Sequence, residues 1–148
     1  MSDIKMKSYR PFITKSFFWD FPTHFNLKEV SHFLGLEIDP TTKYISDSAK
    51  TIMRNDGIYW LLQRKHTEKI SALISLSDLD LDNQKAALMV TFKDVTDAEK
   101  SEIAQRLLVF LKEQISLKTI EINQLDRIVQ ENFTNNGYNV TNNTLKRS

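Results

Sequence analysis

The densest run of side chains that could do chemistry is the acidic segment Asp78–Asn83, in which aspartate alternates with leucine. Its start has the spacing of a calcium-binding loop, but the sixth loop position is Asn83, where the sharp turn needs glycine, and the twelfth is Met89, where a bidentate glutamate is needed. The pattern therefore favours a strand end and a solvated hairpin turn, and no metal is predicted. A site for a cation, a basic peptide or a polyamine is the alternative.

Other residue types that carry catalysis are absent or scattered. The chain has no cysteine, which excludes thiolate metal sites and cysteine nucleophiles. The three histidines, His24, His32 and His66, lack the spacing of metal ligands. The sequence also lacks the GxSxG, P-loop, HExxH and dinucleotide-binding motifs. It therefore gives no support to a hydrolase, an NTPase or a dehydrogenase.

The segment Val95–Lys100 has the pattern of a helix N-terminus closed by a capping box between Thr96 and Glu99. Apolar residues then recur at helical spacing and predict an amphipathic helix, at Ile103, Leu107, Phe110 and Leu111. A helix N-terminus attracts phosphate groups through its free backbone N–H groups. Here the capping box uses some of these donors, and Asp97 and Glu99 add negative charge at the same place.

The remaining elements follow from periodicity and from turn residues. A helix is predicted to open at Asp39-Pro40-Thr41 and to end at Asn55-Asp56-Gly57. An antiparallel meander of three strands follows, at 58–64, 69–76 and 85–92, with the last turn at 78–84. After the capped helix come a strand at 119–122, a helix over 125–133 and a short strand at 138–141.

The two ends of the chain are expected to be less regular. Pro22 disfavours an unbroken helix through the aromatic cluster between Phe12 and Phe25, so this cluster is predicted to be buried in irregular or short helical structure. The large aromatic residues, Trp19 and Trp60 among them, are expected to be core. The polar residues 142–148 are predicted to fray.

Composition limits the class of protein. A chain of 148 residues with 41% hydrophobic content is long enough for one core, and its formal charge of +1 gives no large field that would gather nucleic acid or an acidic membrane. The apolar stretches are too short to cross a bilayer, and Met1–Lys7 lacks the apolar region of a signal peptide. The sequence predicts a soluble, cytoplasmic protein without nucleic-acid or membrane partners, and leaves a homodimer open.

Several short segments are similar, in order, to the motifs of one family. They are Tyr9-Arg10-Pro11-Phe12 (L-R-P-F), Val30-Ser31-His32-Phe33-Leu34-Gly35-Leu36 (V-T-x-Y-L-G-x), Tyr59-Trp60 with Lys69-Ile70 (Y-W-A-I and the next strand) and Asn136-Gly137-Tyr138 (L-G-F). The chain thereby resembles the GNAT N-acetyltransferase superfamily, in the branch that includes the ribosomal-protein N-terminal acetyltransferases. The resemblance implies one acyltransferase domain over residues 1–148. Its α/β fold would have a mixed, mostly antiparallel twisted sheet, helices on both faces and a splayed parallel strand pair.

The resemblance also implies a place for acetyl-CoA between the splayed strands. In the family, the pyrophosphate sits on a turn of sequence Q/R-x-x-G-x-G/A. Its glycine positions fall on Thr96 and Ala98, and Val95 stands in place of the basic or amide residue. Lys93 and Lys100 could offset the added negative charge. The cofactor-binding residues implied in this way are Val90, Thr91, Val95, Thr96, Asp97, Ala98, Glu99, Lys100 and Asn123.

The family's catalytic side chains are not matched. The glutamate of its A-E-L-G-Y strand falls on Ala87, which cannot act as a general base, and the serine of its N-x-x-S falls on Val129. Asn123 could line the cofactor cleft, but the interpretation favoured here is a cap for the next helix. The leading hypothesis is an acetyl-CoA-dependent N-acetyltransferase of a primary amine on a protein, peptide or small molecule, with its catalytic residues unknown. The alternative is an inactive GNAT-fold module for interaction or ligand sensing.

Overall fold

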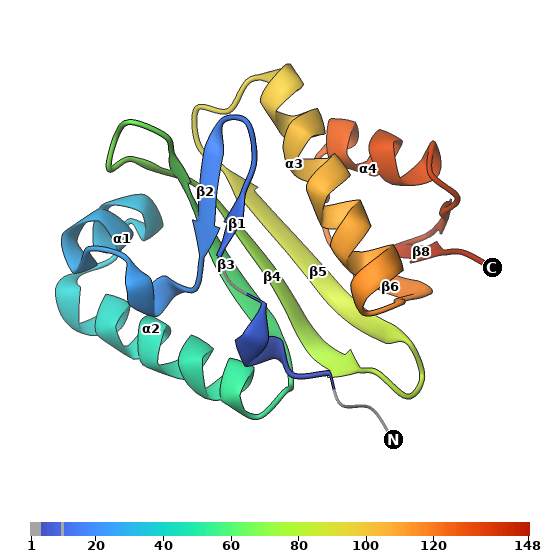
Figure 1. Ribbon diagram of the computed structural model, residues 1–148, viewed down its shortest axis with the longest axis horizontal. Helices are drawn as coiled ribbons and strands as arrows, with labels where there is room; N and C mark the ends of the chain where they lie inside the picture. Colours follow the sequence, from blue (N-terminus) through green and yellow to red (C-terminus); the bar gives the residue numbers. More distant parts are fainter. Residues whose placement is uncertain (1–3, 10) are drawn as a thin grey trace.

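The computed structural model describes residues 4–9 and 11–148, which form one eight-stranded sheet of order β1-β2-β3-β4-β5-β6-β8-β7 (Figure 1). The strands are β1 (Phe12–Ile13), β2 (Phe17–Asp20), β3 (Ile58–Arg64), β4 (Ile70–Asp80), β5 (Lys85–Phe92), β6 (Thr119–Ile122), β7 (Asn139–Thr141) and β8 (Thr144–Lys146). The helices are η1 (Met6–Ser8), η2 (Pro22–His24), α1 (Leu27–Leu34), α2 (Ile38–Met53), α3 (Asp97–Val109), the π-helical η3 (Phe110–Gln114) and α4 (Arg127–Thr134). Within the described ranges, no helix has the length and apolar character needed to cross a membrane.

The predicted meander is confirmed, with one change of length. β3 and β5 have the predicted bounds, whereas β4 continues past Leu76 to Asp80, which pairs with Lys85 after an irregularity in register. The Asp80 carboxylate accepts hydrogen bonds from the backbone N–H (3.1 Å) and the side-chain amide (2.7 Å) of Asn83. The turn is therefore confined to 81–84, and the first half of the predicted turn is strand.

Helices cover both faces of the sheet, as expected, because side chains of β3 and β4 alternate between two apolar layers. On one face Trp60, Leu62 and Ile74 pack with apolar residues of α3 and α4. On the other face Leu61 and Leu73 pack with α1 and α2, through Val30, Phe33, Tyr44 and Ile45. The sheet is antiparallel throughout except for the pair β5–β6. The mixed, mostly antiparallel α/β architecture is thus confirmed.

The helices on the α2 side begin differently from the prediction. Periodicity gave no helix over 27–34, yet Asn26 caps α1 by accepting hydrogen bonds from two backbone N–H groups, and Gly35 ends it at φ 68°. The predicted Asp39 cap is wrong. α2 begins two residues earlier than that cap implies, at Ile38, after Glu37, whose side chain makes no capping bond. Pro40 fits because it lies in the first turn, where a backbone N–H has no helical partner.

The aromatic N-terminal segment is more regular than predicted. Phe17–Asp20 is a strand that pairs antiparallel with β1 on one side and β3 on the other, and it ends before Pro22, which cannot donate a backbone hydrogen bond. Its burial is confirmed, since Trp19 and Trp60 are fully buried and meet edge to face, with ring centroids 5.8 Å apart. Arg10 of the Y-R-P-F motif lies outside the described residues.

The C-terminal residues do not fray as predicted. β8 lies between β6 and β7 and pairs antiparallel with both, with Leu145 fully buried. The Arg147 guanidinium donates to the Leu117 carbonyl (3.0 Å), which also accepts from the Tyr138 hydroxyl (2.8 Å). The polar composition concealed this strand, because only one of its side chains faces the core.

Candidate functional site

The parallel strands β5 and β6 pair over only half of β5. Their register runs from Lys85↔Thr119 to Leu88↔Ile122, and β5 then continues for four more residues, Met89–Phe92. On its other edge β5 stays paired with β4 as far as Phe92. The backbone of Met89–Phe92 on the β6 side therefore borders an opening between the two strands. This arrangement is the splayed parallel pair that was expected.

A groove of about 450 Å³ lies beside this opening on the α2 side of the sheet, and we call it the β5–β6 groove. Its lining comes from α2, β3, β4, β5, β6 and the residue after β6: Tyr44, Tyr59, Leu73, Ser75, Ser77, Ala87, Leu88, Met89, Glu121, Ile122 and Asn123. The volume falls in the range of small-molecule sites, about 300–1,000 Å³. Most of the lining is apolar, with a few hydroxyl, amide and carboxylate groups that could orient a ligand.

The two tyrosines form an aromatic wall of the groove. Tyr44 and Tyr59 meet edge to face, with ring centroids 5.9 Å apart and planes at 90°. Burial raises the pKa of the Tyr44 hydroxyl above its ordinary value, and the neighbouring Tyr59 adds to the shift. The Tyr44 hydroxyl is therefore neutral near pH 7 and can donate a hydrogen bond.

The N-terminus of α3 is closed by the chain's own side chains, in an arrangement of Thr96, Glu99 and Arg64 that we call the α3 cap. The predicted capping box is confirmed: Thr96 Oγ1 accepts from the Glu99 N–H (3.2 Å), and Glu99 Oε1 accepts from the Thr96 N–H (3.0 Å). The Arg64 guanidinium then donates to both carboxylate oxygens of Glu99 and, at 3.1 Å, to the Asp94 carbonyl. This bidentate contact with Arg64 lowers the pKa of Glu99 to about 2.

The α3 cap leaves two donors unused. An α-helix begins with four N–H groups that have no helical partner. Here these are the N–H groups of residues 96–99, of which the Thr96 N–H bonds to Glu99 Oε1 and the Glu99 N–H bonds to Thr96 Oγ1. Among the residues that the structure describes, none accepts from the N–H of Asp97 or Ala98. These two groups are the ones that a phosphate could reach without displacing the α3 cap.

The lysines near this helix end are also engaged. Lys93 Nζ donates to the carbonyls of His32 (3.3 Å) and Phe33 (2.9 Å) at the end of α1.

Counted back from Thr96, the spacing Q/R-x-x-G puts the basic residue of the family's turn on Lys93. The earlier placement on Val95 is therefore corrected.

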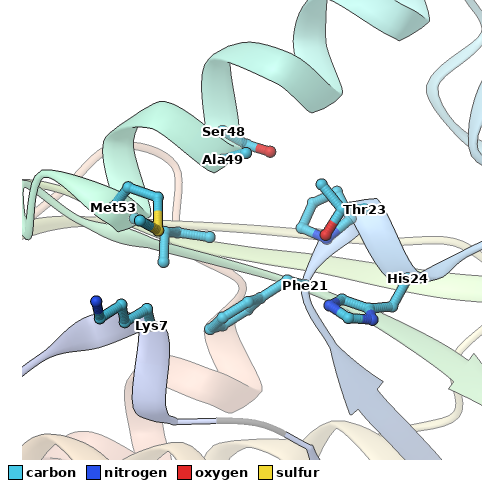
Figure 2. Close-up of a pocket in the computed structure, with 9 residues that line it drawn as sticks. Lys7, Phe21, Thr23, His24, Ser48, Ala49 and Met53 are labelled. Carbon is cyan, nitrogen blue, oxygen red and sulfur yellow. The ribbon is translucent and has the colours of Figure 1, made fainter.

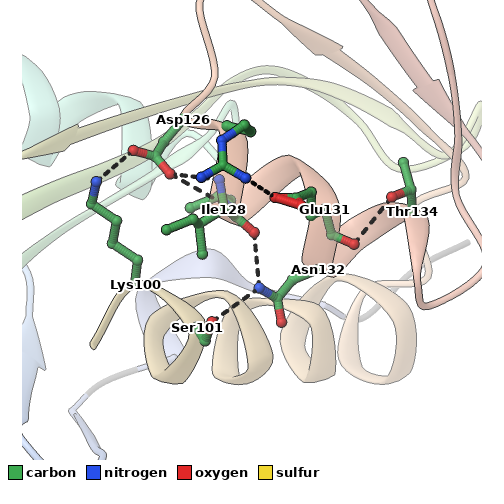
Figure 3. A network of polar contacts seen from close by, with 9 residues as sticks. Lys100, Ser101, Asp126, Ile128, Glu131, Asn132 and Thr134 are labelled. Atoms are coloured by element: carbon green, nitrogen blue, oxygen red, sulfur yellow. Dashed lines mark hydrogen bonds and ion pairs between the residues drawn. The ribbon is translucent and has the colours of Figure 1, made fainter. Parts of the chain in front are cut away.

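A bridge between α3 and α4 lies next to the α3 cap (Figure 3). Lys100 Nζ is 2.8 Å from Asp126 Oδ2, and Asp126 also caps α4 by accepting from the N–H of Ile128 (2.8 Å). Burial acts to raise the pKa of Asp126, but the hydrogen bonds from Lys100 and from the helix N–H groups outweigh it and lower the pKa. Asn132 joins the same two helices through Ser101 Oγ (3.3 Å). We call the Lys100–Asp126 pair the α3–α4 bridge.

The predicted cofactor residues fall into three places around the opening. Val90 and Thr91 lie in the unpaired half of β5, and the run from Val95 to Lys100 forms the start of α3. Asn123 lines the β5–β6 groove, and the cap of α4 is Asp126, so the favoured interpretation of Asn123 as a cap was wrong.

Sequence reasoning missed Glu121, Arg64 and the two tyrosines. Glu121 had a signal: it alternates with Ile120 and Ile122, so it must lie on the opposite face of β6, and the parallel register places it beside Ala87. Arg64 had none, because only the fold brings the end of β3 to the start of α3.

Comparisons with known proteins place this geometry in a class. No protein-family model matches the chain, and no curated protein gives a significant match. Solved structures do match in fold. A RimL ribosomal L7/L12 alpha-N-protein acetyltransferase has a TM-score of 0.68 at 10% identity, covering 95% of this chain and 96% of its own. The ribosomal-protein-S5-alanine acetyltransferase from Vibrio fischeri has a TM-score of 0.65 at 10% identity, covering 88% and 84%.

A third match carries a ligand in its structure. The microcin C7 self-immunity acetyltransferase MccE, solved with acetyl-CoA and AMP, has a TM-score of 0.62 at 12% identity, covering 89% of this chain and 88% of its own. With the mixed sheet and its one parallel pair, these likenesses show that the chain has the GNAT fold. The expectation drawn from the sequence motifs is confirmed at that level.

Proposed function

We propose that the chain transfers an acetyl group from acetyl-CoA to a primary amine of a protein, a peptide or a small molecule. The observation that carries the proposal is that β5 extends four residues past the end of its pairing with β6, directly beside the β5–β6 groove. Donor and acceptor can then meet in the opening from opposite sides of the sheet, which supplies the proximity that a direct attack needs. Backbone N–H groups on the free edge of Met89–Phe92 are in place to hold the thioester carbonyl and its developing oxyanion.

Glu121 is the side chain that we assign as general base. It is the one carboxylate in the lining of the groove, and its register partner on β5 is Ala87. Neighbouring strands lie about 4.7–4.9 Å apart, so a carboxylate on Glu121 reaches nearly the same space as a side chain at 87. Its side chain is also exposed to solvent.

In the proposed reaction the amine nitrogen attacks the thioester carbonyl, a C–N bond forms and the C–S bond breaks. The proton lost by nitrogen passes to Glu121, and the sulfur leaves as a thiolate that takes up a proton. The hydroxyls of Tyr44 and Tyr59 lie in the same groove, and burial raises the pKa of Tyr44, so the Tyr44 hydroxyl can donate to the reacting groups.

For the phosphates of acetyl-CoA, the chain's own residues fit in part. The N–H groups of Asp97 and Ala98 remain available at the positive end of α3. Arg64 lies at the same helix end and could contact a phosphate if Glu99 released it. We therefore expect acetyl-CoA to bind more weakly than a site with a free helix N-terminus would allow.

The second candidate is a non-catalytic GNAT-fold module, and the α3 cap favours it. In the α3 cap, the Glu99 carboxylate accepts hydrogen bonds from the Thr96 N–H and from Arg64. Both donors would otherwise be available to a pyrophosphate. The α3–α4 bridge engages a further cation nearby. A module of this kind would use the β5–β6 groove to bind a ligand or a partner without acetyl transfer.

Isothermal titration with acetyl-CoA and with free CoA separates the two candidates. Heat on titration, followed by a mass increase of one acetyl group on an amine from a panel of peptides and polyamines, supports the transferase. No heat at millimolar acetyl-CoA would remove it. Binding without transfer to any amine of the panel would favour the module instead.

A further inference from the structure

A second pocket, separate from the β5–β6 groove, lies between η2 and the last turns of α2 (Figure 2). It has a volume of about 240 Å³ and shares no lining residue with that groove. Its floor is buried: Phe21 is 6% exposed, Ile52 4% and Ser48 2%. Three segments that are far apart in the sequence line it: Lys7, residues 21–24 and residues 48–53. We call it the η2–α2 pocket.

The floor of the η2–α2 pocket is apolar in character. The ring of Phe21 and the side chain of Ile52 supply most of it, and the Ser48 hydroxyl donates to the Ile45 carbonyl at 2.7 Å. The one buried polar group of the floor is therefore already satisfied. A ligand that fills the floor must be apolar at that end, since a polar group buried there would lose its bonds to water.

The rim of the pocket has the opposite character. Figure 2 shows Lys7 and His24 at its edge, with the exposed Met53 beside Lys7. None of the lining residues is acidic. Across residues 4–9 and 11–148, no carboxylate pairs with the Lys7 ammonium. A rim that carries the Lys7 ammonium and no carboxylate, above an apolar floor, is complementary to a molecule with a negative head and an apolar tail.

We propose that the η2–α2 pocket binds a small carboxylate with a short apolar tail, with the tail against Phe21 and Ile52 and the carboxylate on the Lys7 ammonium. The imidazole of His24 lies on the same rim. The volume is below the range of drug-sized sites, about 300–1,000 Å³, so the ligand is small. This site does not depend on the proposed acetyl transfer.

The probe for this proposal is hexanoate, titrated into the whole chain while backbone amide shifts are followed by NMR. Hexanamide is the matched probe, because it has the same tail and no charge. We expect saturable shifts at Phe21, Ile52 and Met53. We also expect hexanamide to bind about two- to five-fold more weakly, which is the effect of one partly exposed ion pair. Lys7→Gln should bring hexanoate down to the affinity of hexanamide.

Two further variants locate the site. Ala49→Leu fills the pocket while keeping a good helix former, and should abolish binding of both probes. Lys50→Gln removes the neighbouring exposed lysine, which does not line the pocket, and should change neither affinity. If Ala49→Leu melts at a lower temperature than the wild type, its loss of binding could come from lost stability. The comparison of Lys7→Gln with Lys50→Gln then tests the proposal by itself. No saturable shifts, or equal affinity for hexanoate and hexanamide, would overturn the proposal.

Discussion

The two sides of the opening between β5 and β6 differ in whether their polar side chains line a groove or bond to one another. On the α2 side, the β5–β6 groove keeps its hydroxyl, amide and carboxylate groups directed into a space of about 450 Å³. On the α3 side, the polar groups bond to one another, in the α3 cap and in the α3–α4 bridge. One side is arranged for a ligand, and the other is arranged for the stability of the helices.

This difference separates two properties that an acetyltransferase needs together. In the proposed reaction, acetyl transfer would use the groove and the free edge of Met89–Phe92. Affinity for the phosphates would depend on the donors at the start of α3, two of which are engaged, the N–H groups of Thr96 and Glu99. Variants on the two sides should therefore change different measurements: rate on the α2 side, and stability or cofactor affinity on the α3 side.

The largest expected effect is on the groove side. Glu121→Gln keeps the size of the side chain but removes the base, so acetyl transfer should fall by about 10²–10⁴-fold, the usual contribution of general-base catalysis. Affinity for acetyl-CoA should stay the same, because Glu121 lies away from α3. Initial rates and isothermal titration measure the two quantities. Glu113→Gln, an exposed glutamate in η3, is the control. An unchanged rate in Glu121→Gln would contradict the assignment.

The next effect is on stability, and it tests whether the α3 cap is structural. The pKa of Glu99 is about 2 in the folded chain against an ordinary value of 4.5. Because the folded pKa is depressed, this stabilisation is complete above about pH 4.5 and is lost as the pH falls towards 2. We expect about 1–2 kcal/mol, less than the full shift implies, since water screens the partly exposed pair.

Urea unfolding at a series of pH values checks this prediction, with Glu99→Gln as the comparison. The glutamine keeps the capping-box pattern but has no charge to lose. The free energy of unfolding of the wild type should fall more steeply than that of Glu99→Gln between about pH 4.5 and 2. Parallel curves for the two proteins would show that the pair with Arg64 contributes little to stability.

Local signals in the sequence predicted the elements on which this comparison depends, but not their contacts. The capping box at Thr96 and Glu99 is a pattern of neighbouring residues, so it was correct from the sequence. The meander and the helices α2, α3 and α4 were also predicted, because their periodicity reflects burial of one face, whereas α1 was not predicted. β8 was missed because a strand of three residues with one buried residue, Leu145, gives no periodic signal.

The candidate site was harder to predict, because its residues meet only after folding. Arg64 and Glu99 are 35 positions apart and come from a strand end and a helix start. Glu121 follows from the alternation in β6, but its place beside Ala87 needs the parallel register of two strands separated by α3. Family resemblance directed attention to α3, while the open groove lies on the other face of the sheet.

A smaller effect is expected on cofactor affinity at the α3 cap. Glu99→Gln removes a negative charge from the positive end of α3 and weakens the hold on Arg64. Affinity for CoA should rise by about two- to five-fold, the size of one charge at a helix end. Isothermal titration with CoA measures it, and Glu113→Gln should leave the affinity as it is. If Glu99→Gln binds CoA no better, the phosphates do not lie at this end of α3.

The smallest effect should come from the α3–α4 bridge, through Asp126→Asn. Asparagine caps a helix as well as aspartate does, so α4 keeps the bonds from Ile128 and Val129. Lys100 loses its ion pair and becomes available to a phosphate at the start of α3. Because one partly exposed lysine contributes about 0.2–1 kcal/mol, CoA affinity should rise by no more than about five-fold.

The expected gain should also shrink as salt is added, since screening weakens contacts between partly exposed charges. Titrations of Asp126→Asn at low and high ionic strength measure this dependence. Lys100→Gln in the same background is the matched control, and it should return the affinity to that of the wild type. A gain that survives in the double variant would mean that the asparagine acts through α4 and not through the released lysine. The Lys100–Asp126 pair would then only hold α3 and α4 together, and it would not keep Lys100 away from a phosphate at the start of α3.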